Sequence, residues 1–196
     1  MQIGETLTYT YAAVGDYTVT VIALSGGAAT VEYSEVVSIV NPLLMPIDFE
    51  DSTINYSFVD FGNAQSTVVP NPDASGMNTS STVGKSVKFN GAEVWAGSFL
   101  TIDEPVDFSS LNNIAIDVWT SEVGEVVKLK LENSDNPDIN TEIDMITSVG
   151  QGWETLIYDF SASDLSQEYN RIVIFFDFGN SGDDTSYYFD NIKLSL

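Results

Sequence analysis

Ile47-Asp48-Phe49-Glu50 opens the long second part of this chain, and Tyr188-Phe189-Asp190-Asn191-Ile192-Lys193-Leu194 closes it. The roughly 140 residues between these segments contain short β-forming runs separated by turn residues, which indicates two packed sheets. In such a sandwich the first and last strands commonly lie side by side, so we expect Glu50 to approach Asp190. The two segments therefore predict a closed all-β domain, and a binding module in preference to an enzyme.

The composition indicates a folded, strongly acidic protein. Its 196 residues are 43% hydrophobic, which is enough for a core. Twenty-nine acidic residues against six basic ones give a net charge of −23, as is usual in proteins of salty environments. Nucleic acids and anionic membranes need a positive surface, so neither is an expected partner. We expect a monomer that binds a neutral ligand or a divalent cation.

The chain has no cysteine and no histidine. Disulfides, thiolate metal sites, Ser-His-Asp catalysis and histidine-based metal chemistry are therefore excluded. No stretch approaches the roughly 20 apolar residues of a membrane-spanning helix. The start, Met1 to Gly4, lacks the basic and then apolar residues of a signal peptide.

Residues 1–41 contain three alternating runs, at 7–11, 17–24 and 30–40. Gly15-Asp16 and Ser25-Gly26-Gly27 have the composition of turns between them. This pattern predicts three strands, which is half of a small sandwich.

The segment from Tyr9 to Val21, Tyr-Thr-Tyr-Ala-Ala-Val-Gly-Asp-Tyr-Thr-Val-Thr-Val, resembles the second half of a polycystic-kidney-disease-type (PKD) immunoglobulin-like domain. The resemblance implies that residues 1–41 are a partial spacer domain without a ligand. Residues 42–46 follow as a linker, in which two prolines limit flexibility. Residues 47–196 then form the main domain.

Strand candidates recur along the main domain between clusters of Gly, Pro, Asn, Asp and Ser. They cover residues 86–89, 94–102, 114–120, 126–132, 142–147, 154–159, 171–178 and 187–194. Short strands at this spacing predict a jelly-roll β-sandwich.

Acidic residues at the two ends of the domain are candidate ligands for a metal. Calcium takes six to eight oxygen ligands and needs no histidine. Asp48, Glu50 and Asp190, with nearby carbonyl groups, are therefore predicted to hold a structural Ca²⁺. The alternative is that they are solvated acids of a very acidic chain.

The tryptophans are candidate platforms for a sugar ring, because flat aromatic side chains stack on the C–H faces of sugars. Alternation places Trp95 and Phe99 on the face opposite to the core, with Gly97 leaving space beside Trp95. Trp119 points outward by the same argument, whereas Trp153 is predicted to fill the core. The core-facing set on the Trp95 strand is Val94, Ala96, Leu100 and Ile102. The alternative for Trp95 and Trp119 is half-buried packing.

Charged residues on the strand faces suggest a polar groove beside these tryptophans. Lys128, Lys130 and Glu132 share the outer face of one strand, and Arg171 shares a face with Asp177 on another. Such a groove would suit sugar hydroxyls, and the alternative is an ordinary charge-paired surface. The predicted ligand-binding set is Trp95, Asp117, Trp119, Lys130, Glu132, Arg171 and Asp177.

One hexapeptide suggests an enzyme. Glu142-Ile143-Asp144-Met145-Ile146-Thr147 resembles the active-site signature of family 16 glycoside hydrolases, which include laminarinases. A retaining glycosidase needs two carboxylates about 5 to 5.5 Å apart. The position of the signature's final Glu is Thr147 here, so we interpret the match as a coincidence and predict no enzyme.

The opening Asp-Phe-Glu, the closing Tyr-Phe-Asp-Asn-Ile and the strand Trp153-Glu154-Thr155-Leu156 resemble galactose-binding-like β-sandwiches, among them carbohydrate-binding modules of families 4, 6, 16 and 22. Many of those modules hold a structural calcium at this place, which implies the same here.

Residues 46–196 resemble the C-terminal modules of surface glycan-binding and laminarinase-associated proteins of marine Bacteroidetes, on the segments 71–80, 93–99 and 175–179. This resemblance implies a non-catalytic, extracellular module that captures the β-1,3-glucan laminarin at the outer cell surface. A structural or adhesive β-sandwich tail, and a small hydrolase or lyase, remain as alternatives.

Overall fold

The computed structural model describes residues 6–24 and 30–196 and gives them twelve strands and no helix. The chain divides into two compact units, Met1–Asn41 with Thr53–Asn55, and Pro42–Ser52 with Tyr56–Leu196. The predicted turn Ser25-Gly26-Gly27 and the segment Met1 to Gly4 lie outside the described residues. Within the described part of the chain, no helix has the length and apolar character needed to cross a membrane.

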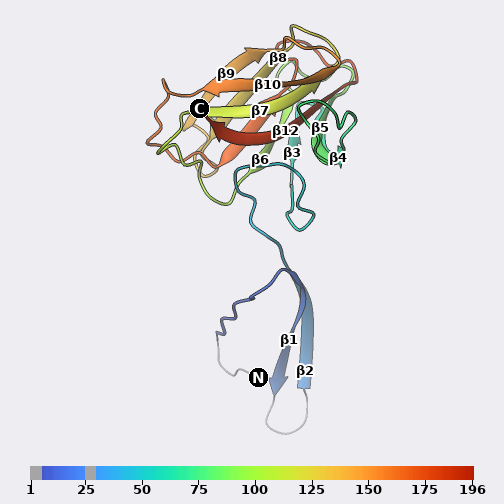
Figure 1. Ribbon diagram of the computed structural model, residues 1–196. Helices are drawn as coiled ribbons and strands as arrows, with labels where there is room; N and C mark the ends of the chain where they lie inside the picture. Colours follow the sequence, from blue (N-terminus) through green and yellow to red (C-terminus); the bar gives the residue numbers. More distant parts are fainter. Residues whose placement is uncertain (1–5, 25–29) are drawn as a thin grey trace. The chain divides into compact units, whose positions relative to one another are not determined.

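The first unit is built on an antiparallel hairpin of β1 (Gly15–Leu24) and β2 (Thr30–Ile39) (Figure 1). The predicted strand at residues 7–11 is wrong, because residues 6–14 form no strand. Alternation along the sequence fixes which side chains share a face, but it does not supply the neighbouring strand that the backbone needs. The Tyr11 ring instead contacts the rings of Tyr9 and Tyr17, at centroid distances of 4.9 and 4.4 Å.

The second unit is a β-sandwich of two five-stranded antiparallel sheets (Figure 1). Sheet I has the order β10 (Gly152–Asp159), β7 (Asn113–Thr120), β12 (Thr185–Ser195), β5 (Thr82–Lys88) and β4 (Ala64–Pro70). Sheet II has the order β3 (Val59–Phe61), β6 (Gly97–Thr101), β11 (Arg171–Phe175), β8 (Val126–Glu132) and β9 (Asn140–Ile146). The prediction of an all-β sandwich is confirmed.

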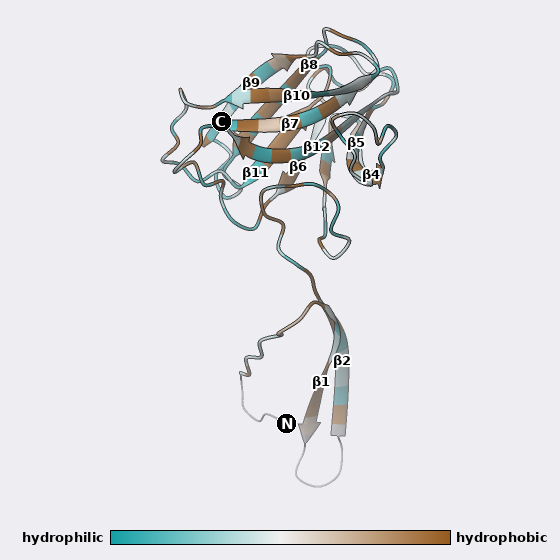
Figure 2. Cartoon of the chain, viewed as in Figure 1, coloured by the Kyte–Doolittle hydropathy of each residue, from teal (hydrophilic) through white to brown (hydrophobic). Residues whose placement is uncertain are grey.

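The core lies between the two sheets and follows from the alternation of side chains along each strand. The fully buried side chains include Ile114 and Ile116 of β7 and Leu129 and Leu131 of β8. Each such side chain contributes about 1.5 to 3 kcal/mol to folding. Figure 2 shows that hydrophobic and hydrophilic residues follow one another along β12.

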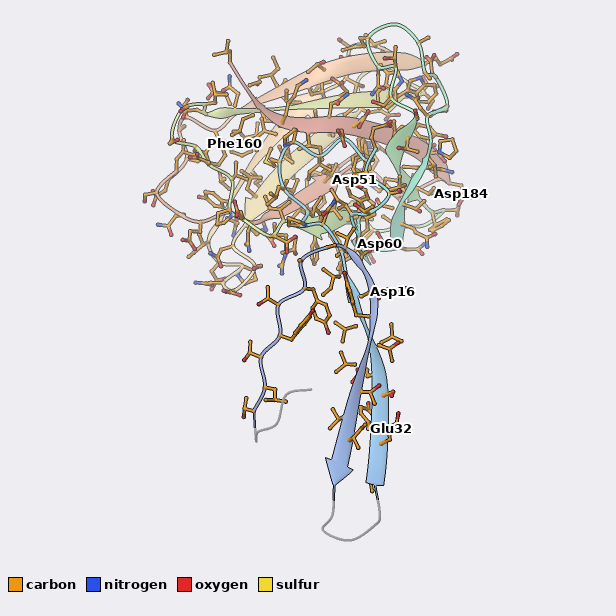
Figure 3. All side chains as sticks on the ribbon, turned by 60° about the horizontal axis from the view of Figure 1, so that its bottom comes forward. Asp16, Glu32, Asp51, Asp60, Phe160 and Asp184 are labelled. Atoms are coloured by element: carbon orange, nitrogen blue, oxygen red, sulfur yellow. The ribbon has the colours of Figure 1, made fainter. Side chains whose placement is uncertain are left out.

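A short polar chain also joins the sheets through the core. Asp60 of β3, labelled in Figure 3, accepts hydrogen bonds from the Ser98 hydroxyl at 2.6 Å and from the Ser66 N–H at 2.9 Å. The Ser66 hydroxyl donates to Ser98 at 2.8 Å. The hydroxyl groups of these buried serines therefore form hydrogen bonds with one another and with a carboxylate that reaches the surface.

The two segments that bracket the domain do meet. Ile47 and Ile192 exchange both backbone hydrogen bonds, each at 2.9 Å. The predicted linker belongs to the second compact unit, since Leu43 is buried and exchanges hydrogen bonds with Asp103. The proline-rich segment is therefore packed against the sandwich.

Strands β3 and β4 were not predicted from the sequence. They form a tight turn at Gly62 and Asn63, both with positive φ, of 67° and 69°. The two strands belong to different sheets, so this turn carries the chain from sheet II to sheet I. The Gly-Asn pair was the available signal, and β3 is only three residues long.

Candidate functional site

The outer face of sheet II gathers most of the predicted ligand-binding residues. The side chains of Leu129, Leu131 and Ile172 point into the core, so the residues between them point outward. The strand register arranges the outward side chains in three rows that end on β9. The rows are Phe61, Gly97, Phe175, Lys128 and Asp144; Val59, Phe99, Val173, Lys130 and Glu142; and Thr101, Arg171, Glu132 and Asn140.

The β8 and β9 half of this face is charged and internally paired. Glu132 forms one ion pair with Lys130, at 2.7 Å, and another with Arg171, at 3.1 Å. The Arg171 guanidinium also lies over the Phe99 ring, 4.3 Å from its centroid. The structure therefore brings the predicted residues Lys130, Glu132 and Arg171 together, with Phe99 beneath them.

Lys128 forms ion pairs with two carboxylates of the edge strand. Its Nζ lies 2.6 Å from Glu142 and 3.3 Å from Asp144. Burial works against the charged form of Lys128, but the hydrogen bonds to Glu142 and Asp144 outweigh it and raise the pKa of the ammonium. Thr147, the last residue of the glycosidase-like hexapeptide, is buried and accepts the Glu125 N–H. The two carboxylates of the hexapeptide are thus held in ion pairs with one lysine.

The other half of the face is aromatic. Trp95 is 48% exposed and stacks on Phe61, with ring centroids 6.1 Å apart and 16° between the planes. Phe61 meets Phe175 edge-on, and Phe175 meets Phe178 in the same way. Lys128 Nζ lies 4.1 Å from the Phe178 centroid. We call Trp95, Phe61, Phe175 and Phe178 the aromatic run, since it connects the exposed tryptophan to the charged half.

Gly97 allows these rings to approach the sheet. A Cβ atom at this position would lie 2.6 Å from the Ile174 carbonyl oxygen and 3.1 Å from the Phe61 ring. No side chain fits there without displacing its neighbours. Gly97 was predicted to leave space beside Trp95. In the structure Phe61 lies in that space, and Trp95 stacks on Phe61.

The predicted orientation of the Trp95 segment needs one correction. Ala96, Leu100 and Ile102 are buried as predicted, but Val94 is 44% exposed. Strand β6 begins only at Gly97, and the Ala96 N–H bonds to the Glu93 carbonyl in a turn. Strand alternation therefore does not apply to Val94.

Asp117 and Trp119 do not belong to this face, so the predicted single groove is wrong in that respect. Both lie on β7 in sheet I. Trp119 packs edge-on against Tyr188, and Asp117 accepts hydrogen bonds from Thr155 and Asn191. The physical reason is that alternation assigns a side chain to a face of its own strand, whereas the sheet that the strand joins depends on distant pairing.

Asp177 and Trp153 have other roles. Asp177 lies in the turn after β11, with φ of 46°, and its carbonyl accepts the Lys88 ammonium at 2.7 Å. Trp153 is buried, as predicted, and its Nε1 donates to the Asp73 carbonyl at 2.9 Å.

The three predicted calcium ligands are engaged separately. Asp48 accepts the Glu50 N–H, and Glu50 accepts both the N–H and the hydroxyl of Thr82. The Thr82 backbone hydrogen bond is the main cause of a lowered pKa for Glu50. Asp190 is fully buried, which raises its pKa, and it accepts the Asn78 amide at 2.8 Å.

No group of three or more acidic side chains in residues 6–24 and 30–196 is arranged to hold a metal ion. Asp190 accepts hydrogen bonds from the Asn78 amide and the Asn191 N–H, and donors of this kind do not coordinate a cation. Calcium binding stays a prediction of the sequence.

Sequence reasoning missed Phe61, Phe178 and Lys88 as parts of this region. Phe61 and Phe178 lie beside turns, where no periodicity marks a face. The sequence places Lys88 in a strand candidate without singling it out, but it is 2% exposed in the structure. Its signal was its scarcity, since only six basic residues occur in the chain.

No protein-family model matches the chain, and no curated protein matches it. Several solved structures share its fold. One comes from a study of promiscuous specificity in carbohydrate-binding modules of the β-sandwich superfamily, with 13% identity, a TM-score of 0.54, and coverage of 97% of this chain and 78% of that one.

Two further structures are similar. A family 11 carbohydrate-binding module from Clostridium thermocellum, in complex with a β-1,3-1,4-mixed-linked tetrasaccharide, has 14% identity and a TM-score of 0.52 over 80% of this chain and 96% of that one. An exo-β-agarase has 12% identity and a TM-score of 0.56 over 79% of this chain, but only 25% of its own length is covered. At these identities the likeness shows the β-sandwich fold.

Proposed function

We propose that the second unit is a non-catalytic carbohydrate-binding module that binds a neutral polysaccharide on the outer face of sheet II. One observation carries the proposal. A half-exposed tryptophan, Trp95, is held flat on Phe61 at the edge of a face whose other half is polar.

This combination suits a sugar chain. A pyranose ring offers a C–H face to an aromatic plane and hydroxyl groups to polar neighbours. Trp95 supplies the plane and is already fixed by Phe61, so little conformational entropy is lost on binding. The Glu142 and Asp144 side chains are about half exposed, at 47% and 50%, and accept hydrogen bonds from hydroxyls.

The charges of the face favour a neutral ligand. Lys128, Lys130 and Arg171 are each paired with a carboxylate. A polyanion would have to break these pairs and approach a chain of net charge −23. Uronic acid polymers and sulfated glycans are therefore poor candidates.

We favour laminarin as the ligand and the outer cell surface as the location. Both choices rest on the sequence resemblance described above. The mixed-linkage β-glucan bound by the family 11 module, which shares the fold, supports the choice of a β-glucan. The ion pairs of Lys128 support a role without catalysis, since they engage both carboxylates of the hexapeptide.

Isothermal titration with laminarin, with mixed-linkage glucan and alginate as comparators, tests the proposal. Laminarin should bind, alginate should not, and Trp95→Ala should lose roughly tenfold or more in affinity, since aromatic anchors commonly carry 1 to 3 kcal/mol. Trp119→Phe, in sheet I, is the matched control and should bind normally. No heat with any of the three glycans would favour a structural tail instead.

A reducing-sugar assay on the same protein separates binding from hydrolysis. We expect no sugar release from laminarin by the wild-type protein. Release that disappears in Glu142→Gln would identify an enzyme and overturn the proposal.

A further inference from the structure

Lys88 is a buried cation that belongs to none of the four ion pairs of the described residues. It is the last residue of β5, and its side chain points between the sheets toward the β11–β12 connection. Its ammonium donates to three backbone carbonyls, those of Asp177 at 2.7 Å, Phe176 at 3.3 Å and Val94 at 3.5 Å. Burying a charge is costly, so a lysine at such a position needs a role that an apolar residue cannot fill.

The three carbonyls belong to two loops. We call residues 89–96 the Trp95 loop and residues 176–184 the Phe178 loop. Backbone hydrogen bonds also join them, from Gly179 to Val94 at 2.9 Å, from Gly182 to Ala92 at 3.1 Å and from Gly91 to Gly182 at 2.8 Å. Two side chains other than Lys88 also join the loops: the Ser181 hydroxyl donates to the Ala92 carbonyl, and the Asp184 carboxylate accepts the Asn90 N–H. Lys88 lies beneath this junction.

Two of the carbonyls directly precede the aromatic residues at the ends of the aromatic run. The Val94 carbonyl precedes Trp95, and the Asp177 carbonyl precedes Phe178. Asp177 has a left-handed backbone, which costs free energy for a residue other than glycine, and the bond from Lys88 compensates for it. The ammonium thus fixes the peptide groups from which both rings project.

The surrounding charges suit a protonated lysine. Burial lowers the pKa of Lys88, while the carboxylates of Asp177 and Asp183 act in the opposite direction. A cation at this place attracts several carbonyl oxygens at once, which a neutral side chain of similar length cannot do.

We propose that Lys88 is a positioning residue for the ligand face, and that its buried ammonium ties the Trp95 loop to the Phe178 loop and so sets the spacing of the aromatic run. The proposal rests on the proposed function of that face. Lys88 itself does not touch the glycan.

The first test needs no ligand. Hydrogen exchange of the Gly179 and Gly182 amides should be roughly tenfold faster or more in Lys88→Met, because the loop junction opens locally. The Ile102 amide, which bonds to Asn170 away from this junction, should exchange at its wild-type rate. Lys88→Arg keeps the charge and should restore part of the protection. Unchanged exchange of Gly179 and Gly182 in Lys88→Met would overturn the proposal.

The second test measures laminarin affinity. Lys88→Met should bind roughly tenfold more weakly, whereas Lys85→Met removes the same charge from the same strand and should bind normally. In a Trp95→Ala background the Lys88→Met change should add little, because the two residues act on one platform. Additive losses would contradict a positioning role.

The two proposals can fail separately. If the wild-type protein binds no glycan, the proposed function fails, and the exchange experiment still decides whether Lys88 ties the loops. If Lys88→Met does not fold, nitrogen-15 spectra of the wild-type lysines replace it. A protected Lys88 ammonium resonance that shifts on addition of laminarin would support the proposal, and one that exchanges like the surface lysines would overturn it.

Discussion

Asp117 and Asp190 lie opposite each other on β7 and β12 and are both buried, at 6% and 0% exposure. Asn191 donates its side-chain amide to Asp117 at 2.9 Å and its N–H to Asp190 at 2.8 Å. Burial and, to a smaller extent, the Asp117 charge raise the pKa of Asp190, while hydrogen bonds from Ser80, Asn78 and Asn191 act against them. Two buried carboxylates are thus held together by amide groups.

This pair should make stability depend on pH. The pKa of Asp190 is higher in the folded than in the unfolded protein, so its contribution is greatest below the unfolded value of 3.8 and is lost as the pH rises through the folded value. Urea unfolding of Asp190→Asn and wild type, in EDTA, should show the variant gaining relative stability from pH 4 upward. A difference that is constant with pH would contradict this.

Asp190 also provides a test of calcium binding. If Ca²⁺ binds the folded protein alone, the melting temperature should be higher in calcium than in EDTA, and Asp190→Asn should remove that difference. Asp16→Asn, in the hairpin of the first unit, is the control and should keep it. Identical melting of the wild type in both buffers would remove calcium from the description of this protein.

Glu125 should lower stability near neutral pH. Its Oε2 is buried without a hydrogen-bond partner, and burial, with the charges of Asp177, Glu122 and Asp183, raises its pKa to about 7. Wild-type stability should therefore fall as the pH rises from about 4.5 to 7. Glu125→Gln should be more stable by about 1 to 2 kcal/mol at pH 8, a value reduced for partial solvent screening.

The matched control for Glu125 is the exposed Glu104. Urea unfolding at pH 5 and pH 8 should show almost no gain for Glu104→Gln at either pH. Equal stability of Glu125→Gln and wild type at pH 8 would mean that water reaches the Glu125 carboxylate.

Gly97→Ala should weaken both the fold and the ligand face. The added methyl group meets the Ile174 carbonyl and the Phe61 ring, so we expect a loss of about 1 to 3 kcal/mol in unfolding free energy. The displaced Phe61 should also lower laminarin affinity through Trp95. Gly152→Ala, whose new methyl group meets only the Val149 side chain, serves as the control for both measurements.

Most strands of the sandwich could be predicted from local sequence, but the sheet that each strand joins could not. Residues 126–132 were predicted as a strand with the bounds that β8 has, because Val, Lys and Leu alternate there without interruption. The burial of Trp153 also followed from local pattern, whereas Trp95 lies in the turn before β6, where strand alternation does not explain its exposure. The assignment of Asp117 and Trp119 failed because strand pairing joins residues far apart in sequence.

The candidate site shows the same division. Lys130 and Glu132 share a strand, so their proximity could be predicted. The stacking of Trp95 on Phe61 depends on how the turns on either side of β6 and β3 approach each other. The scarcity of basic residues marks Lys88 as unusual, but its role could not be predicted from sequence, since its partners are backbone carbonyls that any residue type provides.

The reciprocal pair of Ile47 and Ile192 has a mechanical consequence. These strands run antiparallel, so the chain enters and leaves the sandwich on the same side. A pull on the polypeptide would peel this pair apart one bond at a time and would next load β12 in sheet I on one side and the segment that leads to β3 in sheet II on the other. Strand β3 carries Phe61, on which Trp95 stacks, so tension that passes beyond this pair would reach the ligand face, and the pair protects the aromatic run for as long as it stays closed.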